Sequence, residues 1–417
     1  MKEEKKATRQ SYGEALVELG KKNKNVVVID ADLSGATKTD LFAKEFPDRF
    51  LDMGIAENNM FATAAGLATC GKIPYSSTFA VFAAGRSYDQ IRNSICYPKL
   101  NVKICATHCG VTVGEDGATH QMIEDISLMR TLPNMTVISP SDDVQTKWAI
   151  EKIADIDGPV YVRLARMKTP IIYEENQTFE IGKAVQIGEG MDATVFATGV
   201  TVAEAIKAQE ELKQQGIDIR VVDIHTIKPI DREMIIRCAK ETKKLISIED
   251  HNIIGGLGSA ISEVLTEEYP CKLLRLGIKD TFGKSGKAEE LMKDFGITAE
   301  TIVNKLRGKL MKTLKFRKNL SELILKNEKT TTWRIFDDKD IKQGDIIEFL
   351  VWETKEAFAK AKIIDVVEKK FKELNEKDMD GHEKFESRDE MYTTYSKYYN
   401  RRVDENTLVK IIKFELI

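Results

Sequence analysis

Short apolar runs alternate with amphipathic segments over the first 310 residues, and this alternation most constrains the fold. Residues 8–22 place Tyr12, Leu16 and Leu19 on one helical face. Residues 26–30 (VVVID) are a short, almost continuously apolar run, typical of a strand buried on both faces of a parallel sheet. The alternation therefore predicts an α/β protein built on parallel sheets.

A polar, glycine-containing stretch near residues 174–191 interrupts the alternation and predicts a domain boundary. We expect a first domain at 1–180 and a second, smaller α/β domain at 185–310. The first domain is predicted to have further strands at 102–106, 136–139 and 160–164. The second is predicted to have strands at 193–197, 219–222, 245–249 and 272–276, and helices at 202–214, 232–242 and 257–266.

Residues 311–417 differ in character and predict a third domain. They are rich in lysine and contain β-like runs at 346–352, 361–367 and 408–416. The join (LRGKL followed by MKTLKF) has no linker, which leaves open whether it is a natural fusion or a joined reading frame.

The overall charge balance excludes a general attraction to nucleic acid or to anionic membranes. The chain has 63 Lys and Arg against 66 Asp and Glu, a net charge of -3, so any anion site must be local. The N-terminus lacks the apolar core of a signal peptide, and the longest uncharged stretch, 58–71, is too short to span a bilayer. We therefore expect a cytoplasmic protein with no membrane partner.

The six cysteines are scattered through apolar segments, which favours reduced thiols over a disulfide framework. Cys105, His108 and Cys109 are close enough in sequence to suggest a metal site. They follow a predicted strand, however, and no second ligand pair lies at the spacing of a zinc site. We predict no metal ligands in this chain.

Two clusters place unusual residues beside a small-residue helix. Glu57 stands at the head of an Ala- and Gly-rich segment, where a carboxylate needs a partner. It is equally explained as a helix N-terminal carboxylate satisfied by local amides. Phe79 and Phe82 are three residues apart; they are either ordinary core residues or the wall of a pocket for a flat heteroaromatic ring.

A third cluster favours an active site more strongly. Residues 107–121 (THCGVTVGEDGATHQ) follow a predicted buried strand and combine two histidines, an aspartate and several glycines. Glycines allow the backbone to approach a ligand closely. Polar groups on a loop after a buried strand are typical of an α/β active site.

Taken together and in this order, the three clusters resemble the pyrimidine-binding domain of transketolases. The resemblance covers about residues 7–310, because the segment from Glu249 through His251 to Ala260 (EDHNIIGGLGSA) resembles a turn and helix of the family's C-terminal domain. It implies the fold of a thiamine-diphosphate pyrimidine-binding domain followed by a transketolase C-terminal domain, and a two-carbon ketol transferase of the pentose phosphate pathway.

The resemblance implies a cofactor site for thiamine diphosphate. Glu57 matches the glutamate that hydrogen-bonds the aminopyrimidine ring nitrogen and favours the imino form. Phe79 and Phe82 match residues that pack on that ring, and Asp32 and Leu33 match residues beside it. A third aromatic usual in the family falls near Gly85 or Tyr88, which leaves its identity open.

The resemblance also implies a site for sugar phosphates. Asp116 and His120 match residues that contact the ketose hydroxyls, and His120 matches one that assists proton transfer. Arg9, His108 and Arg166 match residues that bind the phosphate, for which the fork of a guanidinium is well suited.

The chain has no GDG motif followed by asparagines, with which the family binds metal and diphosphate. The resemblance therefore implies the C-terminal subunit of a split transketolase, with a separate N-terminal subunit that holds Mg²⁺ or Ca²⁺ and the diphosphate. The cofactor would be shared between the two chains, and an α2β2 heterotetramer is expected.

Three alternative functions remain open. The β subunit of 2-oxoacid dehydrogenases lacks a GEDGATHQ-like loop, and deoxyxylulose phosphate synthases typically have GADG at Gly114 and are single long chains. A non-catalytic regulatory or binding protein is disfavoured by the presence of Glu57, Asp116 and His120.

Residues 311–417 resemble ASCH domains, small PUA-like β-barrels associated with RNA or modified nucleosides. The resemblance lies in KTTTWR at 329–334, Gly344-Asp345 and GHEKFES at 381–387. Some members are amidohydrolases that use a lysine, a threonine and a glutamate, and the matching positions are Lys329, Thr332 and Glu386. Lys329 and Arg334 are otherwise explained as solvated charges, and Glu386 as a helix cap.

Overall fold

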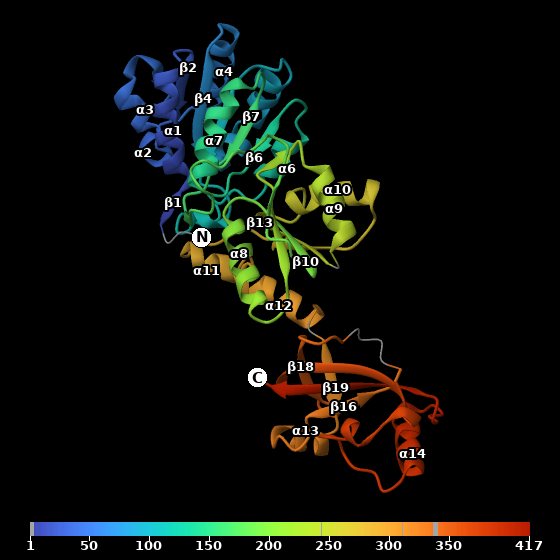
Figure 1. The fold of residues 1–417 in the computed structure, drawn as a ribbon. Helices are drawn as coiled ribbons and strands as arrows, with labels where there is room; N and C mark the ends of the chain where they lie inside the picture. The colour runs from blue at the N-terminus through green and yellow to red at the C-terminus, as the bar shows by residue number, and fades with distance from the viewer. Residues whose placement is uncertain (1–3, 243, 311, 337–340) are drawn as a thin grey trace. The chain divides into compact units, whose positions relative to one another are not determined.

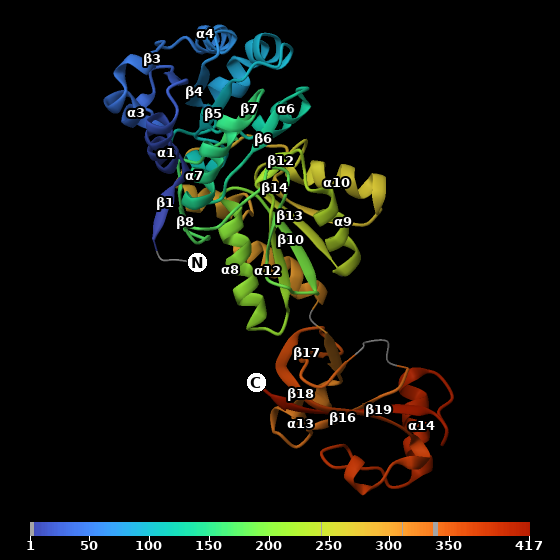
Figure 2. The same ribbon diagram turned by 45° about the horizontal axis from the view of Figure 1, so that its top comes forward.

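The computed structural model describes residues 4–242, 244–310, 312–336 and 341–417. They form two compact units. Unit 1 comprises residues 1–213 and 218–305, and unit 2 comprises 214–217 and 306–417 (Figures 1 and 2). Within unit 1, residues 4–182 (the first subdomain) and 183–305 (the second subdomain) each build a sheet.

The first subdomain contains a seven-stranded sheet with the order β12-β6-β7-β5-β4-β2-β3. All neighbours are parallel except β12, an antiparallel edge strand that the second half of unit 1 contributes. A separate antiparallel pair, β1 and β8, lies beside it. The strands are β1 (Lys5–Ala7), β2 (Val26–Asp30), β3 (Phe50–Asp52), β4 (Ile73–Phe79), β5 (Lys103–Thr107), β6 (Thr136–Ile138), β7 (Val160–Arg163), β8 (Lys168–Pro170) and β12 (Thr226–Lys228).

Helices cover both faces of this sheet, as the sequence predicted. Tyr12 and Leu16 of α1, with Ile150 of α7, belong to the core on one face. Met60 and Phe61 of α4 belong to the core on the other face. The helical elements are α1 (Thr8–Lys22), α2 (Ser34–Thr37), α3 (Asp40–Glu45), η1 (Pro47–Arg49), α4 (Glu57–Thr69), η2 (Val81–Arg86), α5 (Tyr88–Gln90), η3 (Ile91–Cys96), η4 (Val111–Val113), α6 (Asp125–Thr131), α7 (Asp143–Lys152) and η5 (Ile153–Asp155).

The second subdomain is a five-stranded sheet with the order β14-β13-β10-β11-β9, parallel except for β9. Leu257 and Ile261 of α10 pack with Ile235 of α9 in its core. The elements are β9 (Val185–Ile187), β10 (Ala193–Ala197), α8 (Thr201–Lys213), β11 (Ile219–Asp223), α9 (Arg232–Glu241), β13 (Leu245–Asn252), α10 (Leu257–Glu268), β14 (Leu273–Ile278), α11 (Ala288–Asp294) and α12 (Ala299–Leu310).

Unit 2 is a mixed five-stranded sheet with the order β15-β17-β18-β19-β16, flanked by α13 and α14. Only β15 and β17 are parallel. Its closure into a PUA-like barrel stays a prediction. The elements are β15 (Thr313–Phe316), α13 (Lys318–Leu325), β16 (Thr331–Arg334), β17 (Ile346–Val351), β18 (Ala357–Lys370), η6 (Phe371–Glu373), η7 (Glu376–Asp378), α14 (Arg388–Tyr399) and β19 (Leu408–Leu416).

The α/β architecture of unit 1 with its two successive sheets agrees with the sequence-based expectation, and one central strand was missed. Strand β4 contains Ser76, Ser77 and Thr78, so it lacks the apolar run that marks a buried strand. The Ser77 hydroxyl is nevertheless satisfied inside, 2.5 Å from the Tyr12 hydroxyl. The boundary between the two units lies at Leu306, five residues before the expected position 311.

Candidate active site

The carboxyl ends of β4 and β5 bring together the aromatic and histidine residues that the sequence singled out. Phe79 ends β4, Thr107 ends β5, and the two are register partners. His108 follows at once, in a left-handed conformation with a φ of 58°. Because this edge of a parallel sheet is where α/β proteins bind ligands, the cluster is positioned as a site.

Four rings form one connected surface at this edge. Phe79 and Phe82 are nearly parallel, with centroids 5.9 Å apart and 9° between their planes. His108 stacks on Phe79 at 3.7 Å, and His120 meets Phe82 edge-on at 5.6 Å. Phe82 is only partly buried, so it is accessible from solvent, and the surface is suited to stacking with a flat ring.

Glu57 lies beside this surface and is bound by an arginine. It is the first residue of α4 and is 3% exposed. Arg86 Nη1 donates to both carboxylate oxygens, at 2.8 and 2.9 Å. The same guanidinium lies 4.5 Å from the centroid of Phe82 and is 48% exposed. The nearly buried Glu57 carboxylate is thus paired with a half-exposed arginine, which can move away into solvent.

His108 is held as a neutral imidazole. Arg9 Nη1 lies 3.3 Å from Nε2 of His108 and donates to the Ala36 carbonyl at 2.8 Å. A guanidinium can only donate, so Nε2 accepts and the proton is on Nδ1, 2.8 Å from the Thr107 hydroxyl. Burial, together with the charges of Arg9 and Arg166, lowers the pKa of His108 to about 3.

Arg166 and Arg9 approach the same side of the cluster. Arg166 Nη1 donates to the Val113 carbonyl at 2.5 Å and to Glu115 at 3.2 Å, and lies 3.9 Å from Asp116. Burial and then the charge of Arg166 lower the pKa of Arg9, whereas Asp116 raises it. The two guanidinium groups are thus within electrostatic reach of each other, a suitable arrangement for an anion.

Asp32 and Leu33 lie at the carboxyl end of β2, on the turn that precedes α2. The Leu33 amide donates to Asp30 at 2.7 Å, and the Asp32 amide donates to Asp52 at 3.1 Å. Asp32 is exposed and has a φ of 59°. Tyr88, near the expected position of a third aromatic, is partly buried and packs against the core to which α4 contributes. Arg86 lies over the ring of Phe82.

The sequence reasoning missed Arg86 and Asp250. Arg86 follows a stretch of small residues and carries no periodic signal. Asp250 lies inside the EDH segment that the resemblance used, and its carboxylate contacts the loop at 110–112. Within the described residues, no group of three or more His, Cys, Asp or Glu side chains is arranged to hold a metal ion. No helix in the described ranges is both long and apolar enough to cross a bilayer.

Comparison with known proteins identifies this architecture. The transketolase pyrimidine-binding domain matches residues 4–171, and the transketolase C-terminal domain matches residues 182–302. The chain is 54% identical over 310 residues to a Methanocaldococcus jannaschii protein named as a transketolase C-terminal section, covering 74% of this chain and 97% of that protein. The chain belongs to the transketolase family.

A split-gene transketolase provides a close structural relative. That structure, described as an inactive beta4 tetramer, has a TM-score of 0.69 and 51% identity, and the match covers 73% of this chain and 98% of that one. Another relative, at 44% identity, is the 6-deoxy-6-sulfo-D-fructose transketolase subunit SqwH of a Clostridium strain; the match covers 71% of this chain and 92% of that protein. Human transketolase is 40% identical over 313 residues, 74% of this chain and 50% of the human protein.

These proportions show which part of a transketolase the chain represents. It spans about half the length of the mammalian transketolases and nearly all of the split-gene relatives. Membership in the family implies use of thiamine diphosphate. Glu57 and the Phe79–Phe82 pair are consistent with its aminopyrimidine ring, since one offers a nearly buried carboxylate and the other an apolar stacking face.

Unit 2 contains a second candidate site. A cavity of about 270 Å³ is lined by two tryptophans, three tyrosines and several cations. Thr332 and Glu383 also line it, and Lys329 forms an ion pair with Glu383. Burial lowers the pKa of Lys329, although Glu383 opposes that shift. Trp333, Arg334, Trp352 and Tyr398 are among the lining residues.

Thr332 lines this cavity, and Lys329 pairs with Glu383, which lines it too, whereas the predicted Glu386 is not among the described lining residues. Glu386 is exposed, and its backbone amide donates to Glu390 at the start of α14. Glu383 contacts Lys329 instead. The GHEKFES segment contains two glutamates, three residues apart, on an irregular segment whose geometry no periodicity fixes. Glu386 stays a prediction, and Glu383 is a second candidate that the structure adds.

Proposed function

We propose that the chain is the C-terminal subunit of a split transketolase that moves a two-carbon ketol unit between sugar phosphates. The observation that carries this is the cluster in which Glu57, Phe79, Phe82, His108 and His120 meet at one sheet edge, within a chain that spans half of a whole transketolase. Thiamine diphosphate, when bound, supplies the carbanion and the electron sink of the reaction.

On the cofactor side, the residues of this chain would bind and orient the aminopyrimidine ring. Glu57 would hydrogen-bond the aminopyrimidine nitrogen once Arg86 moves aside, and Phe79 and Phe82 would pack against the ring. Asp32 and Leu33 would lie beside the ring at the end of β2. A carboxylate bonded in a water-excluded site shifts a protonation equilibrium more than it would in water.

On the substrate side, neutral His108 with Arg9 and Arg166 would bind the anionic end of the sugar, and Asp116 and His120 would contact its hydroxyls. His120 would also assist proton transfer. A phosphate and a sulfonate both fit two guanidinium groups. The SqwH relative makes a sulfonated ketose a donor to test beside ketose phosphates.

The missing half of the site implies a partner. We expect a separate N-terminal subunit that binds the diphosphate and Mg²⁺ or Ca²⁺, and an α2β2 assembly in which the cofactor lies between the chains. Deoxyxylulose phosphate synthase and 2-oxoacid dehydrogenase activities are the alternatives within the same chemistry, and a non-catalytic binding role is the alternative outside it.

The test is reconstitution. The chain is mixed with the N-terminal subunit, thiamine diphosphate and Mg²⁺, and transfer from xylulose 5-phosphate to ribose 5-phosphate is assayed, with 6-deoxy-6-sulfofructose as a second donor. Transfer only in the mixture, lost with Glu57→Ala, supports the proposal. A stable complex that instead decarboxylates pyruvate favours the alternative activities, and transfer by this chain alone contradicts partner dependence.

A second function is proposed for unit 2: binding of a modified nucleoside or RNA base, with hydrolysis of an amide bond. The pair of buried Lys329 with half-buried Glu383 favours it, because Glu383 lines a cavity together with Thr332, Trp352 and Tyr398. Aromatic faces stack on bases, and a lysine with a lowered pKa can activate a hydroxyl nucleophile while a glutamate relays the proton.

This function is tested on the full chain with an N-acylated nucleoside and with a short single-stranded RNA. Quenching of tryptophan fluorescence reports binding, and release of the acyl group reports hydrolysis. Hydrolysis that is lost in Thr332→Val and Glu383→Gln but retained in Glu386→Gln supports catalysis. Quenching without hydrolysis reduces the proposal to binding, and neither signal overturns it.

A further inference from the structure

The loop between β5 and α6 carries three of the proposed substrate residues, yet it has little regular structure of its own. His108, Gly110, Gly114 and Gly117 all have positive φ. Several of its backbone hydrogen bonds close short turns, such as the Gly114 amide to the Val111 carbonyl at 3.1 Å and the Gly117 amide to the Gly114 carbonyl at 3.2 Å. The Cys109 amide reaches the Leu164 carbonyl, just after the neighbouring strand β7, only at 3.4 Å. Such a loop needs outside support to fix its side chains.

The second subdomain supports the loop at several points. The Lys284 carbonyl accepts from Gln121 Nε2 at 2.9 Å, and the Asn252 amide donates to the Ile123 carbonyl at 2.8 Å.

The segment at 111–112 is held by a carboxylate. Asp250, on β13, is buried. Its Oδ1 accepts from the Val111 amide at 2.9 Å, and its Oδ2 accepts from the Thr112 hydroxyl at 2.6 Å and the Thr112 amide at 3.3 Å. At Gly110 a Cβ atom would lie 2.1 Å from this carboxylate, so only glycine fits against it.

Asp250 is itself fixed from the first subdomain. Arg163, at the end of β7, donates from Nη2 to the Asp250 carbonyl at 2.9 Å and from Nε to Asp125 at 2.8 Å. Tyr161 donates to the same Asp125 oxygen at 2.8 Å. The backbone of Asp250 is therefore joined to a buried network that crosses between the subdomains of unit 1, and its carboxylate extends from this fixed point to the loop.

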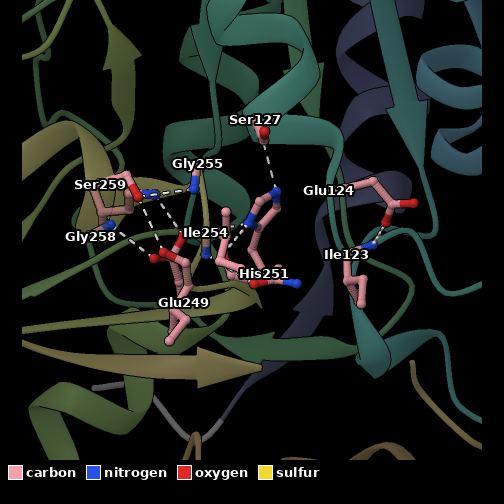
Figure 3. Close-up of polar contacts among 12 residues, drawn as sticks. Ile123, Glu124, Ser127, Glu249, His251, Ile254, Gly255, Gly258 and Ser259 are labelled. Atoms are coloured by element: carbon pink, nitrogen blue, oxygen red, sulfur yellow. Dashed lines mark hydrogen bonds and ion pairs between the residues drawn. The ribbon is translucent and has the colours of Figure 1, made fainter. Parts of the chain in front are cut away.

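The neighbours of Asp250 on β13 have other partners. Figure 3 shows Glu249 turned toward the start of α10, where it accepts from the Gly258 amide at 2.8 Å and from the Leu257 amide at 2.6 Å. His251 points toward Ser127 on α6. Of these three consecutive residues, Asp250 is the one whose side chain holds the loop.

We propose that Asp250 is a positioning residue that fixes residues 110–112 and, through them, the loop that carries His108, Asp116 and His120. The second subdomain thereby influences the affinity for the anionic ketose without contacting it. This inference rests on the proposed function, because it assigns a role to that same site. Asp250 itself has no contact with the aromatic cluster among the described residues.

The test compares Asp250→Asn with Glu249→Gln. Both replace a buried carboxylate on β13 by its amide, and each removes an acceptor from backbone N–H groups. Only Asp250→Asn is expected to loosen the loop, because Asp250 accepts from the loop amides whereas Glu249 accepts from amides of α10. Hydrogen exchange of the isolated chain should show faster exchange of the Val111 and Thr112 amides in Asp250→Asn, and not in Glu249→Gln. This readout needs neither partner nor cofactor.

In the reconstituted enzyme, Asp250→Asn should raise KM for the ketose phosphate about tenfold or more, as expected for lost hydrogen bonds to a charged acceptor, with a smaller change in kcat. Thr112→Val should change KM in the same direction by a smaller factor, and Thr112→Ser, which keeps the hydroxyl, should restore the wild-type value.

The possible failures are distinguishable. Unchanged exchange at residues 111–112, or an unchanged KM in an active Asp250→Asn enzyme, overturns the positioning role. An equal rise in KM for Glu249→Gln also overturns it, because the effect would then be general to β13. If the wild-type mixture transfers nothing, the proposed function fails, and the exchange data alone decide whether Asp250 holds the loop.

Discussion

The Glu57 carboxylate has one partner in the chain alone and would have a different one in the proposed enzyme. In the chain alone, Arg86 neutralises a charge that is nearly inaccessible to water. In the proposed enzyme, Glu57 must face a ring nitrogen instead. The half-exposed position of Arg86 on Phe82 allows it to move without disturbing the core.

Replacement of Arg86 by Met should therefore destabilise the isolated chain. Removing one partner leaves a nearly buried carboxylate uncompensated, and because the arginine is half exposed we expect a loss of only about 1–2 kcal/mol in the free energy of unfolding. Urea denaturation measures it. Arg92→Met, at an exposed position in η3, is the control. An equal loss in both variants would remove any special role for the Arg86 pair.

His108 predicts a pH dependence of stability. Its pKa is about 3 in the folded chain, against an ordinary value of 6.5. Between these values the unfolded chain binds a proton that the folded chain does not, so stability falls as the pH drops from about 6.5 toward 3. His108→Gln should lose about 2–3 kcal/mol less than the wild type between pH 7 and pH 4.5, since this range covers about two units below the ordinary pKa.

Urea unfolding at the two pH values measures this difference. The other buried histidines contribute equally to both proteins and cancel in the comparison. Parallel stability curves for His108→Gln and the wild type would show that His108 is not held neutral in the folded chain.

At the scale of elements, Asp142 joins a helix to the connection between subdomains. Its Oδ1 caps α7 by accepting from the Gln145 amide at 2.8 Å. Its Oδ2 accepts from the Ile172 and Tyr173 amides at 2.8 and 3.0 Å. One carboxylate thus fixes both the start of α7 and the segment that leaves β8.

Asp142→Asn should keep the cap of α7 but weaken the hold on the segment that follows β8. The amide can keep the helix cap through its oxygen but turns an NH₂ group toward two N–H donors, so we expect a loss of about 1–3 kcal/mol in the free energy of unfolding. Chemical denaturation measures the loss. A change below about 0.5 kcal/mol, the range of ordinary surface substitutions, would contradict the anchoring role.

The sequence predicts an element or a site residue where its signal is local, and misses it where the role depends on a partner distant in sequence. Strand β2 was predicted with its observed bounds, because an apolar run carries its own signal. Strand β4 was missed, because it carries three consecutive hydroxyl residues, of which Ser77 finds its partner in Tyr12 on a different element. Arg86 and Asp250 were missed for the same reason: each acquires its role from a partner far away in sequence, which no local spacing reveals.

Glu383 is an intermediate case. The GHEKFES segment offers two glutamates, and which of them meets Lys329 depends on the fold and not on the motif. Motifs locate such a site to within a few residues, and tertiary contacts decide which side chain enters it.

For the whole molecule, each unit has its own hydrophobic core. Phe349 is fully buried in the core of unit 2 together with Phe316 and Phe414. Phe196 is fully buried in the core of the second subdomain of unit 1. Since stability depends on the core in which a side chain is buried, each phenylalanine should report on its own unit.

Calorimetry of the full chain tests this. We expect Phe349→Leu to cost about 1–2 kcal/mol and to lower the melting transition of unit 2 by several degrees. Phe196→Leu should lower the transition of unit 1, by fewer degrees per kcal/mol because that unit is larger. Equal shifts of one common transition by both variants would mean that the two units unfold as a single cooperative body. If each variant shifts only the transition of its own unit, the two units unfold independently. A substitution that damages the site in one unit can then be studied while the other unit stays folded.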